Sequence, residues 1–216
     1  MGEEMDVRVK ICGLTRREDA ERAVAAGAWA LGVIFAGESP RRVTVEQARE
    51  ILAAAPPDVE RVGVFVNASL EEIAAAVEAC GLTAVQLHGE ESAGFARSVG
   101  ERTGARVIWA VRVSGPGSLA GVVQFDTGMV LLDTYSPERR GGTGRTFDWE
   151  LVRELPEELR SGRLILSGGL NPENVVSALE AVDPYALDVS SGIESAPGVK
   201  DPGRMERLFD ILKEKR

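Results

Sequence analysis

The sequence predicts an α/β protein, a single closed (β/α)8 barrel, from three observations. Short apolar runs rich in β-branched residues recur eight times, and each has the composition of a strand buried on both faces. Helical patterns lie between these runs, and alternation of strand and helix favours a parallel sheet. The 216 residues divided among eight such units give 27 residues per unit, which suits a compact barrel with short loops. An open, doubly wound sheet is the alternative architecture.

The elements can be placed in order along the chain. The expected strands are 7–11, 30–35, 61–66, 84–87, 107–113, 129–132, 164–166 and 186–189. The expected helices are 17–26, 45–55, 70–80, 92–102, 149–155, 172–182 and 202–215, with a weak helical pattern around 118–124. No linker or low-complexity stretch interrupts the series, so we expect residues 1–216 to form one domain of the TIM-barrel type.

Start and stop signals support several of these helices. Ser69 and Glu72 form a capping box, and Asn171 precedes a proline suited to the first helical position. Gly27 and Gly81 each follow a helical run, where glycine adopts the left-handed conformation that ends a helix. These signals predict the starts of two helices and the ends of two.

Composition excludes two classes of protein. The hydrophobic fraction of 44% is sufficient to bury a core, so the chain is not disordered. Against 34 Asp and Glu stand only 25 Lys and Arg, a net charge of −9, and a nucleic-acid partner requires a basic face. We therefore expect a phosphorylated or other small-molecule ligand or a protein partner, and the sequence leaves open whether the chain is a homodimer.

The sequence also bears on compartment and metal content. The longest uncharged stretch, 23–37, is broken by Gly27 and Gly32 and is shorter than the roughly 18 residues of a membrane span. The acidic start differs from a signal peptide, so we expect a cytoplasmic protein without a membrane segment. Cys12 and Cys80 cannot build a disulfide framework, and one histidine leaves too few soft ligands for structural zinc. We expect no metal and no cofactor, although carboxylates could hold Mg²⁺.

Glycines after the last two predicted strands indicate a phosphate site. The active site of a barrel lies at the carboxyl ends of its strands, where backbone N–H groups and a helix N-terminus can bind an anion. The candidate residues are Gly168, Gly169, Ser191 and Gly192. The alternative is a pair of tight turns that need positive φ. Segment 141–144, which contains Gly142, is either a loop that adds amides to this site or a flexible connection.

Two residues at other strand ends are candidates for proton transfer. Cys12 precedes a helix N-terminus, which together with an inward-facing Lys10 can stabilise a thiolate base or nucleophile. A small buried hydrophobe is the alternative, and it is our interpretation of Cys80. Asp133 ends the apolar run 129–132, where desolvation favours the protonated, proton-donating carboxyl group. It could instead cap a turn or pair with Arg112.

Three further polar residues lie near predicted strand ends. Arg41 and Arg42 offer bidentate recognition of a carboxylate or phosphate, or lie in a solvated loop. His88 is expected to be a positioned, neutral hydrogen-bonding residue. The chain has no nucleophile elbow, P-loop or dinucleotide fingerprint, which excludes the enzyme classes that depend on them.

The chain resembles the phosphoribosylanthranilate isomerase family. The likeness runs from about Val7 to the last helix. The segments that carry it are Lys-Ile-Cys-Gly-Leu-Thr at 10–15, Leu-Asp-Thr at 132–134 with Gly-Gly-Thr-Gly-Arg at 141–145, and the serine- and glycine-containing segments 166–175 and 188–194. Matches at four strand ends, in order, make the resemblance highly specific.

The resemblance implies an activity and a role for each site residue. The reaction is the Amadori rearrangement of N-(5-phosphoribosyl)anthranilate in tryptophan biosynthesis. Asp133 would protonate the furanose ring oxygen, the ring would open to a Schiff base, and Cys12 would remove the C2 proton. The family pattern also places Arg41, chosen over Arg42 by its Ser-x-Arg spacing, near the anthranilate carboxylate. It places Asp188 on the substrate and Gly142, Gly169 and Gly192 on the phosphate.

The sequence leaves two kinds of alternative function open. Another phosphosugar barrel, such as an isomerase of histidine biosynthesis or indoleglycerol phosphate synthase, would be expected to use two aspartates or a Lys/Glu set. The first strand here ends instead in Cys12. A barrel that binds phosphorylated metabolites without turnover, or a thiol redox protein, is the other alternative, but Cys12 has no resolving cysteine nearby in the sequence.

Overall fold

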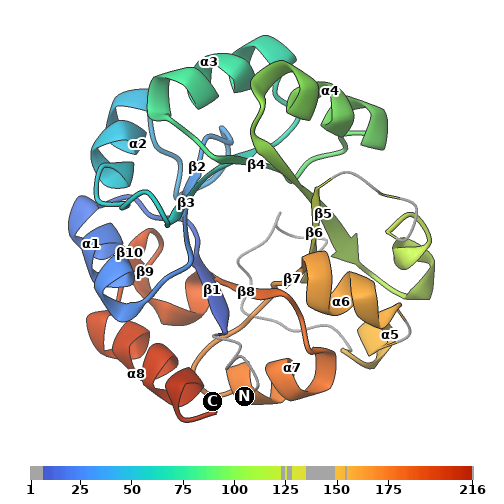
Figure 1. Cartoon of the computed structure of the whole chain (residues 1–216). Helices are drawn as coiled ribbons and strands as arrows, with labels where there is room; N and C mark the ends of the chain where they lie inside the picture. The colour runs from blue at the N-terminus through green and yellow to red at the C-terminus, as the bar shows by residue number, and fades with distance from the viewer. Residues whose placement is uncertain (1–6, 123–124, 126–127, 135–148, 154, 216) are drawn as a thin grey trace.

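Eight parallel strands close into a barrel in the structure, a computed structural model that describes residues 7–122, 125, 128–134, 149–153 and 155–215. The strands follow one another around the barrel in chain order, and β8 pairs with β1 (Figure 1). Their bounds are β1 (Arg8–Ile11), β2 (Ala30–Ile34), β3 (Glu60–Phe65), β4 (Ala84–Leu87), β5 (Arg106–Val113), β6 (Met129–Thr134), β7 (Leu164–Leu166) and β8 (Ala186–Val189). Closure confirms the predicted (β/α)8 barrel and excludes the open sheet.

The helices form an outer ring around the strands (Figure 1). They are α1 (Arg17–Ala26), α2 (Val45–Leu52), α3 (Leu70–Cys80), α4 (Ala93–Thr103), α5 (Glu150–Arg153), α6 (Glu157–Arg163), α7 (Val175–Val182) and α8 (Pro202–Lys213). The Ser69–Glu72 capping box is confirmed, and Gly27 and Gly81 both end their helices in the left-handed conformation. None of the described helices has the length and apolar composition that crossing a membrane requires.

Beyond the one or two residues by which helix ends vary, the predicted helices were wrong at four places, the first being α2, which ends at Leu52 rather than Ala55. Helix α7 begins at Val175 because the Asn171 side chain accepts hydrogen bonds from the N–H groups of Glu173 and Asn174 and so closes a separate turn before the helix. The pattern around 118–124 corresponds to a short 3-10 turn, η1 (Pro116–Leu119). Segment 149–163 carries two helices rather than one, since Pro156 disfavours helical backbone in the residue before it.

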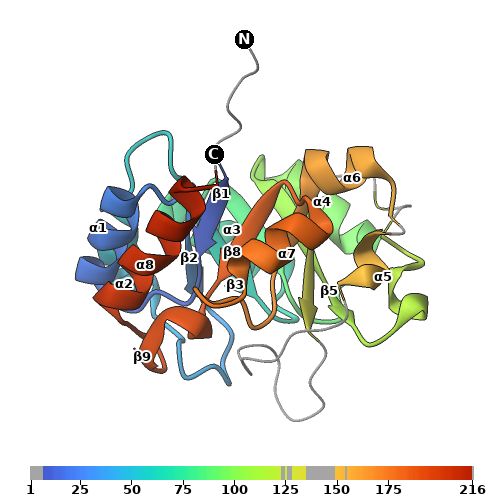
Figure 2. The same ribbon diagram turned by 90° about the horizontal axis from the view of Figure 1, so that it is seen from below.

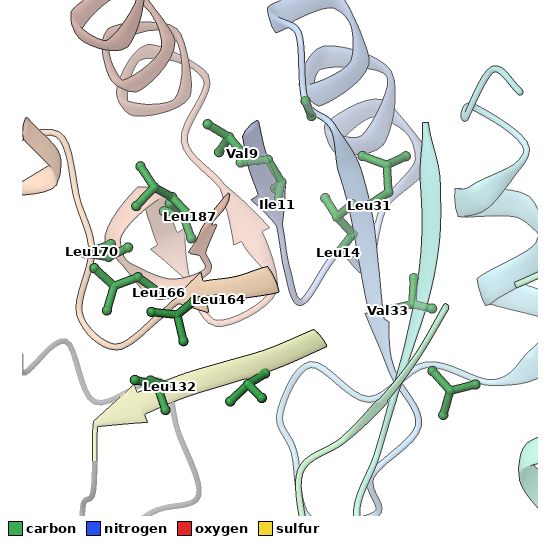
Figure 3. Close-up of a cluster of buried hydrophobic side chains, with 14 of the residues drawn as sticks. Val9, Ile11, Leu14, Leu31, Val33, Leu132, Leu164, Leu166, Leu170 and Leu187 are labelled. Carbon is green, nitrogen blue, oxygen red and sulfur yellow. The ribbon is translucent and has the colours of Figure 1, made fainter. Parts of the chain in front are cut away.

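The alternation of side chains along the strands builds two apolar layers. Between sheet and helices lie Val9, Ile11, Leu31, Leu132, Leu166 and Leu187, among others (Figure 3). A smaller cluster fills the barrel interior: Ala30, Val62, Ala84, Ile108, Ala110, Met129, Leu131, Ile165 and Ala186. Because successive residues of a strand face opposite sides, the polar neighbours of the outward residues point inward, above this cluster. These inward polar residues are Lys10, Gln86, Asp133, Ser167 and Asp188, all buried.

A two-stranded hairpin follows β8 and was absent from the prediction. It consists of β9 (Glu194–Ala196) and β10 (Val199–Lys200), preceded by the 3-10 turn η2 (Ser191–Ile193). Figure 2 shows β9 at the lower rim of the barrel. Since the hairpin follows the carboxyl end of β8, it lies at the same end of the barrel as the predicted site.

Candidate active site

A buried ion pair joins β1 and β8 inside the barrel. Lys10 Nζ lies 2.7 Å from Asp188 Oδ1, and the two residues are register partners. The other carboxylate oxygen of Asp188 accepts a hydrogen bond of 3.1 Å from Ser167 Oγ. Burial lowers the pKa of Lys10, but attraction to Asp188 and Cys12 outweighs burial and leaves that pKa raised. Lys10 therefore stays a cation within the barrel.

Cys12 directly follows β1, and its thiol lies beside this ion pair. The side chain is buried, and Gly32 of β2 provides the space for it. A Cβ atom at Gly32 would lie 3.1 Å from Cys12 Sγ and 3.2 Å from Lys10 Cε. The positive charge of Lys10 acts directly on the thiol and lowers its pKa. Lys10 thus faces inward, next to the thiol, which is the condition under which we expected it to stabilise a thiolate.

The charge state of the thiol differs from the expectation. Burial raises the pKa of Cys12, and although Lys10 lowers it, the net shift is upward. We expected a helix N-terminus to favour the thiolate, but α1 begins only at Arg17, five residues beyond Cys12. The dipole of a helix acts within its first turn. Lys10, rather than the helix, is therefore the principal group that favours the thiolate.

Asp133 lies at the end of β6 in a polar environment. Its side chain is buried, as the sequence predicted, and Oδ1 accepts a hydrogen bond of 2.8 Å from the Thr134 N–H. His88 Nε2 lies 3.2 Å from Oδ2, which is within ion-pair distance, although the ring N–H lacks hydrogen-bond geometry toward that oxygen. His88 Nδ1 lies 2.9 Å from Gln86 Nε2. Because an amide nitrogen only donates, Nδ1 accepts, and the proton of a neutral ring lies on Nε2, toward Asp133.

Three buried polar atoms near Asp133 have no hydrogen-bond partner among the described residues: Gln86 Oε1, His88 Nε2 and Arg112 Nε. Arg112 donates from Nη2 to the His88 carbonyl oxygen at 2.7 Å. That nitrogen therefore bonds to the backbone of His88 and not to Asp133, the partner considered as an alternative. Buried polar atoms are nearly always paired in folded proteins. An unsatisfied group of this kind is typical of a site that a polar ligand completes.

The structure separates the two candidate arginines. Arg42 is exposed, whereas the Arg41 side chain is only 11% exposed and lies over Gly13, next to Cys12. Arg41 is bidentate, as we expected of such a residue, but its partner is Glu194 of the protein. Arg41 is thus the arginine that lies beside the thiol.

The glycines expected to bind phosphate meet where the loops after β7 and β8 pack together. Gly168 and Gly169 have φ of +92° and +69°, so the requirement for positive φ holds at both. A Cβ atom at Gly192 would overlap the Leu170 carbonyl oxygen, which shows how closely the two loops approach. Ser191 begins the turn η2 beside Gly192. Gly142 and segment 141–144 lie outside the described residues.

Sequence reasoning missed several residues of this region. Gln86, Thr134, Ser167, Glu194 and Lys200 contact predicted site residues but had no assigned role. Strand alternation could have found Gln86 and Ser167, since both are polar residues on the inward face of apolar strands. Nothing in the spacing of Glu194 and Lys200 marks them as buried. Among the described residues, no group of three or more His, Cys, Asp or Glu side chains is arranged to hold a metal ion.

A buried thiol and a buried carboxyl group at one mouth of a barrel, beside glycine loops suited to phosphate, define the class: an acid–base enzyme of the (β/α)8-barrel type. The family model of N-(5'-phosphoribosyl)anthranilate isomerase matches residues 9–211. A curated relative of that name from Pelobacter propionicus is 45% identical over 210 residues, which cover 97% of each chain. The chain belongs to the phosphoribosylanthranilate isomerase family.

Solved structures of the family agree with this assignment. The crystal structure of phosphoribosyl anthranilate isomerase from Thermotoga maritima has a TM-score of 0.88 and 45% identity, covering 96% of this chain and 99% of that one. A complex with reduced 1-(o-carboxyphenylamino)-1-deoxyribulose 5-phosphate has a TM-score of 0.85 and 43% identity, with the same coverage. A third structure contains monomers generated from the dimeric Thermotoga maritima enzyme, with a TM-score of 0.85, 42% identity and the same coverage.

Proposed function

We propose that Cys12 and Asp133 perform the two proton transfers of the reaction that this chain catalyses. That reaction is the Amadori rearrangement of N-(5-phosphoribosyl)anthranilate to 1-(2-carboxyphenylamino)-1-deoxyribulose 5-phosphate, a step of tryptophan biosynthesis. One observation carries the proposal: both side chains are buried at the same end of the barrel interior, Cys12 beside Lys10 and Asp133 beside His88.

Asp133 is the general acid. The Thr134 N–H donates to Oδ1, and a protonated carboxyl group accepts best through its carbonyl oxygen, so the transferable proton lies on Oδ2. Protonation of the furanose ring oxygen breaks its bond to C1, and the anthranilate nitrogen supplies the electron pair that forms the Schiff base. Acid catalysis of this kind contributes about 10²–10⁴-fold.

Cys12 is the general base. Its thiolate removes the C2 proton of the Schiff base, whose positively charged nitrogen accepts the electrons and becomes an enolamine. Tautomerisation then gives the ketone product. The Lys10 ammonium favours the thiolate over the thiol, and Asp188 fixes the position of that ammonium. Asp188, which the resemblance places on the substrate, is already bonded through both oxygens, so we assign it primarily to Lys10.

We place substrate binding at the carboxyl ends of other strands of the barrel. We assign the phosphate to the amides around Gly168, Gly169, Ser191 and Gly192, because Gly168 and Gly192 leave room only for backbone and Gly168 and Gly169 have positive φ. We assign the anthranilate carboxylate to Arg41, which lies beside Cys12. We further propose that residues 1–216 form one catalytic domain, that it acts in the cytoplasm, and that it assembles as a homodimer, as the Thermotoga maritima relative does.

The test follows the fluorescence of N-(5-phosphoribosyl)anthranilate, generated in situ, as purified protein consumes it. We expect turnover by the wild type and a loss of at least about 10² in kcat for Cys12→Ala. Cys80→Ala, the other buried thiol, is the control and should retain kcat. Absence of wild-type turnover anywhere between about pH 6 and 9 would contradict the activity, and near wild-type kcat in Cys12→Ala would remove Cys12 from the base role.

A further inference from the structure

The hairpin after β8 brings a buried carboxylate to Arg41. Glu194 of β9 accepts from Arg41 Nε at 2.8 Å through Oε1 and from Arg41 Nη2 at 2.6 Å through Oε2. The two side chains are 11% and 5% exposed, and 153 residues separate them in the sequence. This arrangement is the bidentate geometry in which a carboxylate fixes the plane of a guanidinium group.

The same carboxylate binds a buried lysine of β10. Lys200 Nζ donates to Glu194 Oε1 at 2.8 Å, to the Cys12 carbonyl oxygen at 2.6 Å and to the Ser190 carbonyl oxygen at 3.1 Å. These three bonds use all three protons of the ammonium group. The side chain of Lys200 has no exposed surface. Lys200 therefore ties the backbone of the proposed base to the hairpin.

The cluster holds two cations, Arg41 and Lys200, around the one carboxylate of Glu194. Burial by itself raises the pKa of Glu194, but Arg41 and Lys200 together outweigh burial and lower it, so the carboxylate is ionised. Such buried ion clusters are weak contributors to stability, because desolvation offsets the attraction between the charges. The cluster instead fixes relative positions, because its hydrogen bonds connect the segments that follow β1, β2 and β8.

Arg41 consequently has one orientation. Its Nε and Nη2 face Glu194, and no hydrogen bond from Nη1 to a described residue is found. Gly13 lies directly beneath the side chain, where a Cβ atom would be 2.6 Å from Arg41 Cδ, and its φ is +71°. The glycine below and the carboxylate at one edge leave the Nη1 edge as the part of the guanidinium group that can meet a ligand.

We propose that Glu194, held by Lys200, is a positioning residue that orients the Nη1 edge of Arg41 toward the carboxylate of the anthranilate ring. This inference rests on the assignment of Arg41 to that carboxylate. It makes Glu194 a determinant of specificity, because the preference of the enzyme for a carboxylate-bearing aromatic ring depends on the orientation that Glu194 imposes.

The experiment measures binding, which requires no turnover. Reduced 1-(o-carboxyphenylamino)-1-deoxyribulose 5-phosphate and the same compound without its carboxyl group are titrated calorimetrically into each protein. The readout is the ratio of the two Kd values. We expect Arg41→Met and Glu194→Gln each to lower the preference for the carboxylated ligand by about tenfold or more, the effect of one hydrogen bond between charged groups. General destabilisation of the protein would weaken the binding of both ligands alike and leave the ratio of their Kd values unchanged.

Glu60→Gln is the matched control. Glu60 also pairs with an arginine, Arg106, at 3.0 Å, but it begins β3 at the opposite end of the barrel, so its substitution should leave the ratio at the wild-type value. Glu194→Asp, which keeps the charge but shortens the reach by one methylene, replaces Glu194→Gln if that variant does not fold, and it should also lower the ratio.

Two outcomes overturn the inference and distinguish its failure from that of the proposed function. A wild-type ratio in folded Glu194→Gln or Glu194→Asp, with a lost preference in Arg41→Met, would refute the positioning role and leave the assignment of Arg41 intact. An unchanged ratio in Arg41→Met would refute the assignment of Arg41, and the inference about Glu194 with it.

Discussion

Lys10 and Asp188 are cross-strand neighbours whose side chains meet 2.7 Å apart inside the barrel, at the closure of β8 onto β1. Cys12 is the next inward-facing position of the chain, directly after β1. The thiol therefore lies beside a cation whose charge a carboxylate partly cancels. Lys10 acts on Cys12 more strongly than Asp188 does, so the pair as a whole favours the thiolate. Burial of the thiol favours the neutral form and outweighs the effect of the pair, so the pKa of Cys12 is raised.

We expect the ionisation of Cys12 to make the activity depend on pH. Because the pKa of Cys12 is raised, the free protein holds the thiol below that pKa, and the thiolate increases as the pH rises through it. We expect kcat/KM to rise with pH on this limb, in proportion to the thiolate fraction. Replacing the pair by Lys10→Met with Asp188→Asn removes its net favourable interaction with the thiolate and moves this limb of the pH profile to higher pH.

Alkylation by iodoacetamide checks this prediction independently of turnover. In a Cys80→Ser background, Cys12 is the remaining thiol, and its rate of alkylation follows the thiolate fraction. The variant that combines Lys10→Met with Asp188→Asn is expected to require a higher pH for half-maximal alkylation than the protein that retains Lys10 and Asp188. An unchanged or lower midpoint in this double variant would show that Lys10 does not govern the ionisation of Cys12.

The barrel itself was predictable from the sequence because its signals are local. Eight buried strands have an apolar, β-branched composition, and the helices between them carry caps such as Ser69 and Gly81, which the structure confirms. The prediction failed where a side chain redirects the backbone: Asn171 closes a turn that delays the start of α7. Such a choice between two hydrogen-bonding patterns is decided by the surrounding structure.

The candidate site was predictable only in part, for a related reason. Strand ends identified Cys12, Asp133 and Arg41, because position along a strand determines which end of the barrel a residue occupies. Partners that lie far away in the chain leave no local pattern. The bond between Lys200 and the Cys12 carbonyl oxygen spans 188 residues, and only closure of the barrel brings its two ends together.

Gly32→Ala tests the space beside the thiol. The added methyl group would lie 3.1 Å from Cys12 Sγ and 3.2 Å from the Cys12 Cα, so the thiol must shift by a few tenths of an ångström. Misplacement by about 1 Å can cost about 10²-fold in rate, so we expect a loss of about tenfold in kcat. Gly162→Ala in α6, where a Cβ atom meets nothing within 4 Å, is the control. Equal kcat in the two variants would show that the packing at Gly32 does not position Cys12.

Single alanine variants distinguish Arg41 from Arg42. Arg41 is mostly buried next to Cys12, whereas Arg42 is exposed. We expect Arg41→Ala to lower kcat/KM by about tenfold or more, the effect of a lost hydrogen bond to a charged group. Arg42→Ala should change it little. Steady-state kinetics on both variants decides the matter, and a larger loss in Arg42→Ala would assign the contact to the exposed arginine.

Asp133→Asn tests the proposed role of Asp133 as the acid while preserving the shape of the side chain. The amide oxygen can still accept from the Thr134 N–H, but the amide group facing His88 cannot give up a proton at neutral pH. We therefore expect kcat to fall by at least about 10² with little change in KM, since the residue acts on the transition state more than on binding. Asp183→Asn is the matched control, because Asp183 ends α7 in the left-handed conformation that asparagine also adopts. A fall in kcat/KM that comes entirely from KM in Asp133→Asn would make Asp133 a binding residue, and the ring oxygen would need another proton donor.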